Sequence, residues 1–502
     1  MGLISIEFGL GFTVFFCFYW LLRPRPDVQN VVLTLASLAL LGYYGSAEVL
    51  LCVVVFTVLV YLLAGRMGEG ASPRARRAWL IVGLAGALLN LAFWKYAEPQ
   101  RGALNALLSA HGLQAGFDSQ WLLPLGLSYY TFQGISYLLA CYRGEIRVAR
   151  RLDFMELLGH FGLFLTVTAG PIHRATDARQ LTGYDGAPCG ALEQIKTREP
   201  RAVLAPMFAL CLILTGLAKK WWLAGWLDTH VVAPVFANPA QYHSLDILAA
   251  IYGYTGKLFF DFSGYSDLVV GLGMLLGLRL PVNFRAPLLA HNLREFWVRW
   301  HISLSTWIRD MIYIPAGGSR GGFWRTQFNL LLAMGLSGAW HGYGWKFALW
   351  GLLHGAGLVA LNAGDRLLGW MPWWRGGGGR GRDFIASLGW PARALGVFLT
   401  AQFVCFCFIL FPVQDLHEAR QIFGALGANG HDIRIGAWTL PALGAMLLLW
   451  LAYPALQYLP EQCARGLARL PAPLRPVLVF AAFALIVLLA PPGIPGFMYA
   501  NF

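Results

Sequence analysis

The stretch from Phe328 to Leu361, FNLLLAMGLSGAWHGYGWKFALWGLLHGAGLVAL, decides the fold class. It contains two apolar runs, and Gly-Tyr-Gly separates them directly after His341. Two complete membrane crossings need about 40 residues, whereas this stretch has 34. The pair is therefore predicted to be short, with a glycine break at or below membrane depth. Broken backbone at that depth is tolerated only beside protein or a water-filled cavity.

The composition extends this prediction to the whole chain. Of its 502 residues, 57% are hydrophobic and 13% are charged, while average soluble domains have about 45–50% apolar and about 25% charged residues. Apolar runs continue along nearly the whole length, which excludes a disordered chain and argues against an ordinary soluble enzyme. The sequence predicts an all-α polytopic membrane protein that forms a single unit over residues 1–502, with its core signature at 121–362 and C-terminal helices within 387–492.

Thirteen apolar runs are candidate spans, although several are shorter than a full crossing requires. They cover residues 3–22, 30–43, 48–64, 78–96, 121–141, 203–224, 245–262, 264–280, 327–341, 345–362, 387–411, 437–458 and 475–492. The run 154–170 is interpreted as re-entrant or surface-lying. Residues 245–283 must make an odd number of net crossings, and no internal repeat is evident.

The net charge of +13 comes from basic clusters between apolar runs, so membrane topology explains it better than nucleic-acid binding. Arg23 and Arg25 follow the first run, which predicts an uncleaved first span with the N-terminus outside. The basic loops at 173–201 and 283–325 and the glycine-rich segment Arg375–Arg382 are then expected inside, and the C-terminus outside. The eight cysteines form no CxxC pair and are expected to be buried free thiols.

His301 lies in the segment Leu293–Tyr313, which has helical amphipathic spacing. One face is predicted to be apolar and tryptophan-rich, and the other to be polar. The apolar face comprises Trp297, Trp300, Leu304, Trp307, Ile308 and Met311, and the polar face comprises Arg299, Ser303, Thr306 and Asp310. Such a helix is too polar to cross a membrane and suits an interface or a protein interior just below it. On pattern alone, His301 could equally be a packing residue.

His341 closes the first apolar run at the glycine break, and an ionisable side chain there is a functional-site hypothesis. A buried neutral imidazole can act as a general base, because desolvation lowers its pKa. His354, on a continuous apolar face, is expected to be structural. Five other histidines are expected at the surface: His111, His230, His243, His417 and His431. No metal-ligand cluster or P-loop is present, so no bound metal or cofactor is expected.

Several segments together resemble the membrane-bound O-acyltransferase family, in its bacterial polysaccharide-modifying branch. They are LPLGLSYYTFQGISYLLACYRG at 123–144, AGPIHR at 169–174, LAKKWWLA at 217–224, FFDFSGYSDLVVGLGMLLGLRLPVNFRAP at 259–287, REFWVRWHISLSTWIRDMIYIPAGGSRGG from Arg294 and LLLAMGLSGAWHGYGWKFALWGLLHG from Leu330. The likeness extends over roughly residues 1–365. The His-x-x-Leu-Ser-Thr-Trp and Trp-His-Gly blocks, in this order, are the most specific part.

The resemblance implies a ring of transmembrane, re-entrant and interfacial helices around a central tunnel. It implies that His341 is catalytic and that His301 assists. The donor would be acetyl-CoA, approaching from the cytoplasm. Periplasmic acetyltransferase-type partners would complete O-acetylation of an exopolysaccharide such as alginate or cellulose. The expected location is the bacterial inner membrane, with lipid as a partner and no nucleic acid.

Other residues are candidates for the substrate site or the tunnel. They are Asp310, Arg309, Trp340, Trp307, Ser305, Asp261, Tyr265, Tyr130 and Gln133, with Tyr129 and Arg299 beside them. Asp310 could orient an imidazole or pair with an arginine, and Arg309 and Arg299 could bind donor phosphates or lie at the membrane surface. The polar group Asp261, Ser263, Tyr265, Ser266 and Asp267 could line a cavity or pair internally.

The sequence therefore predicts a membrane O-acyltransferase that moves acetyl groups, with His341 as general base. Three alternatives remain open. One is a transporter or export channel for a polysaccharide or its precursor. The second is a D-alanyl transferase acting on teichoic acid, and the third is an assembly scaffold without catalysis.

Overall fold

The computed structural model describes residues 5–97, 101–111, 126–177, 181–368, 389–431 and 433–491, and these residues are predominantly helical. Their β-structure amounts to one isolated antiparallel bridge between Thr182 and Pro188. The prediction of an all-α polytopic protein is confirmed. The Arg375–Arg382 loop lies outside the described residues. The prediction of a single unit over 1–502 stays a prediction, and contacts group the chain into two compact units.

The first unit comprises the described residues up to Ile213 together with Tyr265–Val282. Its helices are α1 (Ile6–Leu21), α2 (Pro26–Tyr44), α3 (Ala47–Arg66), α4 (Pro73–Ala92), α5 (Arg101–Ala110), α6 (Leu127–Arg143), α7 (Phe154–Gly162), α8 (Ala191–Ile195) and most of α9 (Pro206–Leu217). A π-helical turn, η1 (Phe93–Ala97), continues α4. Within this unit, α6 packs against both α3 and α4, and α7 packs against α2 and α3.

The second unit comprises Leu214–Gly264 and the described residues from Asn283 onward. Its helices are α10 (Gly225–Leu227), α11 (Ala233–Ala237), most of α12 (Ser244–Leu275), α13 (Leu293–Arg299), α14 (Ile302–Ile308), α15 (Gly322–His341), α16 (Trp345–Leu368), α18 (Trp390–Phe408), α19 (Leu416–Ala428), α20 (Thr439–Leu456), α21 (Leu459–Arg469) and α22 (Leu474–Leu489). Shorter π-helical and 3-10 turns join them, including η3 (Ala218–Ala224) and η7 (Arg309–Tyr313).

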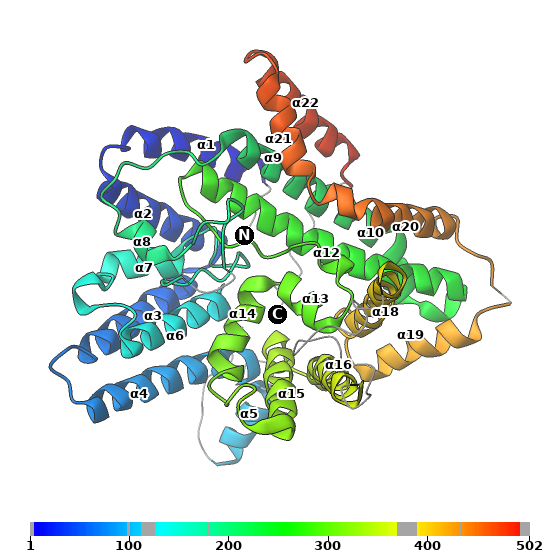
Figure 1. Cartoon of the computed structure of the whole chain (residues 1–502), viewed down its shortest axis with the longest axis horizontal. Coiled ribbons are helices and arrows are strands. Elements are labelled where there is room, and N and C mark those ends of the chain that lie inside the picture. The colour runs from blue at the N-terminus through cyan, green and yellow to red at the C-terminus, as the bar shows by residue number, and fades with distance from the viewer. Residues whose placement is uncertain are drawn as a thin grey trace. The chain divides into compact units, whose positions relative to one another are not determined.

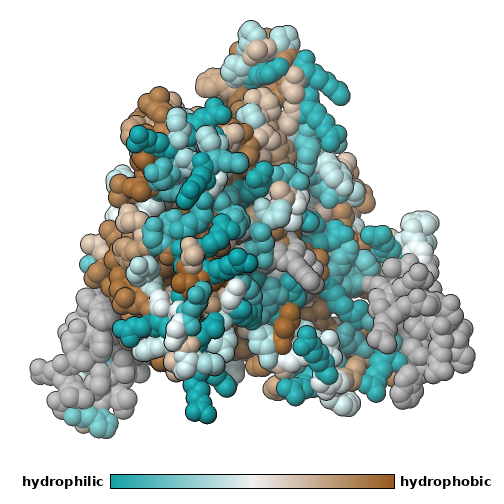
Figure 2. Space-filling model, turned by 60° about the vertical axis from the view of Figure 1, so that its left-hand side comes forward, coloured by the Kyte–Doolittle hydropathy of each residue, from teal (hydrophilic) through white to brown (hydrophobic). Residues whose placement is uncertain are grey.

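Seven helical segments among the described residues are long and apolar enough to cross a membrane. They are Ala47–Arg66, Pro73–Tyr96, Pro206–Ala237, Ser244–Leu275, Trp345–Leu367, Trp390–Phe408 and Thr439–Leu456. Many large apolar side chains on these helices are exposed. On the face drawn in Figure 2, hydrophobic residues gather along the left-hand flank, while hydrophilic residues cover the centre. Exposed apolar surface of this extent indicates contact with lipid.

A single helix takes the place of the two spans predicted at 245–262 and 264–280. Figure 1 shows α12 as a continuous helix, and it runs from Ser244 to Leu275. The break was expected near Ser263, where polar residues interrupt the apolar run. The helix continues because these residues are buried and their carboxylates have partners. The ammonium of Lys220 contacts the carboxylate of Asp261, and the hydroxyl of Tyr184 donates to Asp267 at 2.7 Å. A paired charge no longer forces a polar segment out of a helical interior.

Helices α15 and α16 form the hairpin expected at the glycine break. A Cβ on Gly338 would lie 2.2 Å from the Phe347 carbonyl oxygen, and one on Gly351 would lie 2.3 Å from the Met334 carbonyl oxygen. The two backbones therefore touch, as small residues permit between membrane helices. α16 has 24 residues and is longer than predicted, so it is not a short span.

The run 154–170 begins as a helix and then becomes irregular. A capping box between Asp153 and Glu156 starts α7, which ends at Gly162. Residues 163–175 are non-helical and almost entirely buried. Buried irregular backbone of this kind is what a re-entrant segment requires, and its depth in the membrane stays a prediction.

Candidate active site

His341 is the last residue of α15 and is buried at the turn of the hairpin. Three aromatic rings surround its imidazole. The centroid distances are 4.7 Å to Trp340, 5.0 Å to Trp350 and 5.0 Å to Phe411. The Trp350 contact is edge to face, with the ring planes at 89°. The imidazole is therefore held in an aromatic pocket at the point where the helix ends.

The glycine contacts of the hairpin explain how these rings reach His341. Gly351 brings α16 against α15 directly beside Trp350, so the indole faces the end of α15. Phe411 lies in the turn after α18, and Lys346 at the start of α16 fixes that turn. The Lys346 ammonium donates to the carbonyls of Phe411, at 3.3 Å, and of Val413. Two kinds of contact therefore form the apolar pocket: the close approach of α15 and α16 at the glycines, and the bonds from Lys346 to the turn that carries Phe411.

His301 lies at a helix break that the sequence pattern did not reveal. The predicted continuous helix 293–313 is wrong, because α13 ends at Arg299 and α14 begins at Ile302. His301 joins them with a φ of 42°, in the left-handed region that non-glycine residues rarely adopt. Residues in this region cost of order 1–3 kcal/mol and concentrate at functional sites. The predicted polar face is also wrong in part, since Ser303 and Thr306 are buried.

Asn283 holds this break in place, and the sequence analysis did not single it out. Its carbonyl accepts the N–H of Ile302 at 3.0 Å, and its side-chain oxygen accepts the N–H of Ser303 at 3.2 Å. The Asn283 side chain is buried, and it satisfies N–H groups that the first turn of any helix leaves open. The available signal was an amide residue inside the apolar stretch LPVNF, at 280–284.

The imidazole of His301 packs against Phe262, with ring centroids 4.6 Å apart and an interplanar angle of 84°. Burial lowers the pKa of His301 to about 3. The ring is therefore neutral at physiological pH, as a proton acceptor must be.

A series of aromatic contacts connects the two histidines within the second unit. Starting from His301, the successive rings are Phe262, Phe284, Trp300, Phe408, Trp350 and His341, with centroid distances from 4.6 to 6.3 Å. The two residues are 40 positions apart in the sequence, yet they belong to one aromatic core. This is the arrangement expected if both serve one site.

His354 lies inside the same core, as its continuous apolar face predicted. It is fully buried, and its nearest rings are Trp350 at 4.9 Å, Trp297 at 5.2 Å and Phe403 at 5.4 Å. Among the described residues, neither of its ring nitrogens has a hydrogen-bond partner. The histidines expected at the surface are exposed, apart from the half-buried His243.

The candidates that follow His301 lie on α14 and on η7. Ser305 closes the turn after the break, because its N–H bonds the His301 carbonyl at 2.9 Å and its hydroxyl bonds the Trp300 carbonyl at 3.0 Å. Trp307 is buried on α14. Arg309 donates to Asp310 at 2.7 Å.

The contacts of Asp310 favour the arginine-pairing alternative over imidazole orientation. Arg299, the other arginine weighed for donor phosphates, pairs with Glu295 at 2.5 Å. Trp340 is half-buried and stacks near His341. The roles of these residues stay predictions.

The remaining candidates divide between the two units. Asp261, in the second unit, forms the buried ion pair with Lys220, which favours internal pairing over cavity lining. Tyr265, in the first unit, shares a 2.6 Å hydrogen bond with Thr168. Tyr130 and Gln133 are fully buried on α6 of the first unit, as is most of Tyr129. These three residues belong to a different unit from His301 and His341, and their role in a tunnel stays a prediction.

Comparison with known proteins decides the family. Residues 120–369 match the membrane-bound O-acyltransferase family, MBOAT. A probable alginate O-acetylase of Pseudomonas aeruginosa is 34% identical over 373 residues, which make up 72% of this chain and 67% of that protein. The chain belongs to the membrane-bound O-acyltransferase family. The resemblance noted in the sequence is thereby confirmed, and the protein is a membrane O-acyltransferase.

Two relatives show how far the acylation chemistry varies in this family. A peptidoglycan O-acetyltransferase of Helicobacter pylori is 28% identical over 81% of this chain and 75% of that protein. A teichoic acid D-alanyltransferase of Bacillus subtilis is 28% identical over 59% of this chain and 70% of that protein. Both candidate histidines of this O-acyltransferase lie inside the segment that matches the family, 120–369.

Proposed function

We propose that this O-acyltransferase moves acetyl groups from cytoplasmic acetyl-CoA across the bacterial inner membrane for O-acetylation of an exopolysaccharide such as alginate. The observation that carries the proposal is the position of His341, buried among aromatic rings at the hairpin turn of the family segment. Transfer of an acetyl group is favoured over transfer of a D-alanyl group, because the acetylating relatives align over more of the chain.

His341 would act as the general base. Its neutral imidazole takes the proton of an attacking hydroxyl, and the oxygen forms a bond to the thioester carbonyl carbon. When the carbon–sulfur bond breaks, the imidazolium returns the proton to the departing thiolate. The products are an O-acetyl ester and free thiol, so the enzyme itself ends unchanged.

His301 would assist this step without taking part in bond making. Burial keeps its ring neutral, and the break at φ 42° fixes the direction in which the ring leaves the backbone. A neutral imidazole held in this way can accept or donate a hydrogen bond to the reacting groups. We assign His354 to the packing of the aromatic core.

The topology of the proposal follows the basic loops. The N-terminus would lie outside, and the segments 173–201 and 283–325 would lie on the cytoplasmic side, where the donor is found. Transfer to the polymer would then be completed on the opposite side by periplasmic acetyltransferase-type partners.

An acetylation assay of the secreted polymer in cells tests the proposal. His341→Ala and His301→Ala are compared with His417→Ala, a matched change at an exposed histidine, with membrane levels measured for all three. Loss of acetyl with normal polymer secretion supports the proposal. Blocked secretion of a normally acetylated polymer would instead indicate a transporter, and normal acetylation in His341→Ala would indicate a scaffold.

The donor is tested separately. Membranes carrying the wild-type protein are supplied with labelled acetyl-CoA or with a carrier protein loaded with D-alanine. We expect the label of acetyl-CoA to be incorporated into the polysaccharide, and no incorporation of D-alanine from the loaded carrier. Incorporation only from the loaded carrier would overturn the acetyl assignment and favour D-alanyl transfer.

A further inference from the structure

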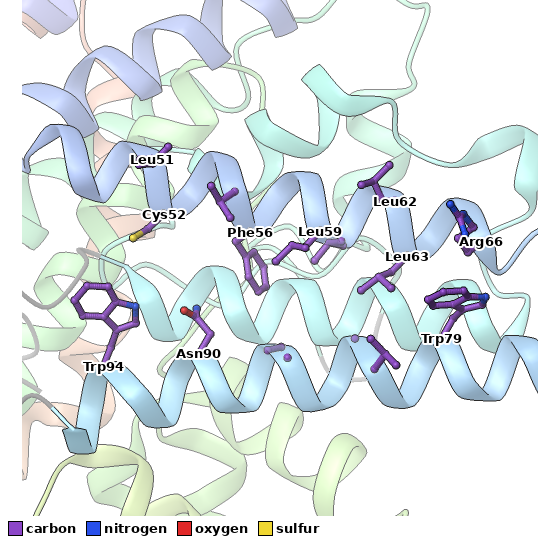
Figure 3. A pocket seen from close by; sticks show the side chains of 16 residues that line it. Leu51, Cys52, Phe56, Leu59, Leu62, Leu63, Arg66, Trp79, Asn90 and Trp94 are labelled. Carbon is purple, nitrogen blue, oxygen red and sulfur yellow. The ribbon is translucent and has the colours of Figure 1, made fainter. Parts of the chain in front are cut away.

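The first unit contains a groove that the proposed acetyl transfer does not use. This α3–α4 groove runs between α3 and α4 above α6, and its volume is about 570 Å³. In Figure 3, Cys52 and Trp94 lie at one end and Arg66 and Trp79 at the other. Phe56 points from α3 into the space between them.

The groove exists because one wall is made of small residues. Between Trp79 and Trp94, the lining positions of α4 include the small residues Gly83, Gly86 and Ala87, which recur at helical spacing together with Val82 and Asn90. On α3 the facing positions are mostly large and apolar. The two helices therefore leave a trough along α4 that side chains do not fill.

Helix α6 supports both walls of the groove. A Cβ on Gly83 would lie 2.8 Å from Leu138 of α6, so α4 packs directly on that helix. Phe56 of α3 packs on Gly134 of α6 in the same way, since a Cβ there would lie 2.6 Å from the ring. Both walls are thus fixed to one support, and the groove is part of the packed first unit.

The depth of the groove sets the chemistry of its occupant. Both α3 and the segment Pro73–Tyr96 are long and apolar enough to span a membrane. Lining residues Leu51, Leu59 and Leu62 are each more than half exposed. An occupant at that depth has to be apolar, because a polar chain would lose hydrogen bonds to water there.

Tryptophans mark both ends of the groove. Trp79 and Trp94 are 15 residues apart, which is about 22 Å along a helix that rises 1.5 Å per residue. Tryptophan is typical of the two membrane interfaces. The groove therefore extends over most of the thickness of a hydrocarbon layer.

One end of the groove carries positive charge. The Arg66 guanidinium lies over the Trp79 ring at 5.5 Å, and in the described part of the chain it has no carboxylate partner. Nearby, Arg151 donates to the carbonyls of Ala64 and Met67 at the end of α3. Arginine is well suited to bind a phosphate group. The occupant should therefore be anionic at this end.

We propose that the α3–α4 groove binds one anionic glycerophospholipid. An acyl chain lies in the trough along the small residues of α4, and the phosphate is bound at Arg66. Its lining includes neither of the candidate histidines, so lipid binding can be tested without an activity assay.

Native mass spectrometry of the detergent-purified protein tests the acyl-chain part. Gly86→Leu should fill the trough, because a Cβ at Gly86 meets nothing within 4 Å. Gly42→Leu is the matched control: it is equally unhindered, is helical on α2, and does not line the groove. With phosphatidylglycerol added, the wild type and Gly42→Leu should retain one bound lipid. In Gly86→Leu the lipid-bound fraction should be at least tenfold lower. Equal retention by both variants would overturn the proposal.

A second experiment tests whether Arg66 binds the phosphate of the headgroup. Phosphatidylglycerol and phosphatidylcholine with the same chains are compared as competitors. Arg66→Gln should abolish the preference for the anionic lipid, and Arg74→Gln, which does not line the groove, should keep it. An unchanged preference in Arg66→Gln would contradict phosphate binding there. A change of oligomeric state in Gly86→Leu, with lipid retained, would show that a second copy of the chain occupies the groove.

Discussion

The imidazole of His341 meets the indole of Trp350 edge to face, with the ring centroids 5.0 Å apart and the planes at 89°. Trp350 is only 1% exposed, so its ring cannot turn away. The contact restricts His341 to one orientation at the end of α15. We therefore expect Trp350 to determine where the proposed base points.

Truncation of this indole should impair both folding and activity. Trp350→Ala removes a fully buried ring and should cost about 3–5 kcal/mol of stability, whereas Trp350→Phe keeps an aromatic neighbour and should retain most acetyl transfer. Thermal melting in detergent and an acetylation assay measure the two effects. Trp345→Ala, at an exposed position of the same helix, is the control. Equal effects of Trp350→Ala and Trp345→Ala would refute this role.

Loss of the Asn283 side chain should disturb His301 specifically. Asn283→Ala leaves the buried N–H of Ser303 without its acceptor, which should cost about 1–3 kcal/mol. Because the change acts through the orientation of His301, kcat should fall while the KM for the donor stays nearly constant. Steady-state kinetics of the purified variant measures both constants. An unchanged kcat would show that Asn283 only stabilises the fold.

The hairpin that carries His341 should be intolerant of one added methyl group. Gly351→Ala would place a Cβ 2.3 Å from the Met334 carbonyl oxygen, and the backbone has to move to relieve this contact. Gly335→Ala is the control, since its nearest neighbour would be at an ordinary 3.7 Å. We expect a lower melting temperature and reduced acetyl transfer for Gly351→Ala alone. Matching melting curves for the two variants would contradict the close helix contact.

Stability should decrease on mild acidification because of two buried histidines in the first unit. The rings of His160 and His173 are 5.8 Å apart. Burial, together with the neighbouring His173, lowers the pKa of His160 to about 3. Burial likewise lowers the pKa of His173 to about 4, although the Cys189 carbonyl and the Asp177 carboxylate oppose this effect.

In the unfolded chain both groups titrate near 6.5. Below about pH 6.5 the unfolded state therefore binds protons that the folded state does not, and stability falls by about 1.4 kcal/mol per pH unit for each histidine. Melting temperatures between pH 8 and pH 5 measure the slope. His160→Leu should make the slope shallower and His417→Leu should leave it unchanged. A slope that His160→Leu does not alter would exclude His160 as its source.

The sequence predicted the class of fold well, because hydrophobic length is a local property. Nearly every apolar run that falls on described residues became a helix, with ends shifted by a few residues. The predictions that were wrong concern positions where contacts between residues distant in sequence decide the local structure. The polar residues around Ser263 suggested a break, but Lys220 neutralises Asp261 and α12 continues.

The same limit applies to the candidate site. The glycine break after His341 was visible in the pattern, since Gly-Tyr-Gly interrupts an apolar run. The break at His301 was not, because the amphipathic spacing continues through it. Asn283 binds the N–H groups of Ile302 and Ser303 directly after the left-handed residue, and it lies too far away in the sequence for helical periodicity to reveal this contact.

The account depends most on His341 as the proton acceptor. Transfer of label from acetyl-CoA to an added polysaccharide hydroxyl acceptor, catalysed by the purified, lipid-reconstituted protein, tests it directly. A positioned general base contributes roughly 100-fold to 10,000-fold to such a rate. The account predicts that His341→Ala lowers the initial rate by about 100-fold or more, while His417→Ala retains the wild-type rate and both variants still show a cooperative melting transition. A His341→Ala protein that is folded and transfers acetyl at the wild-type rate would contradict it.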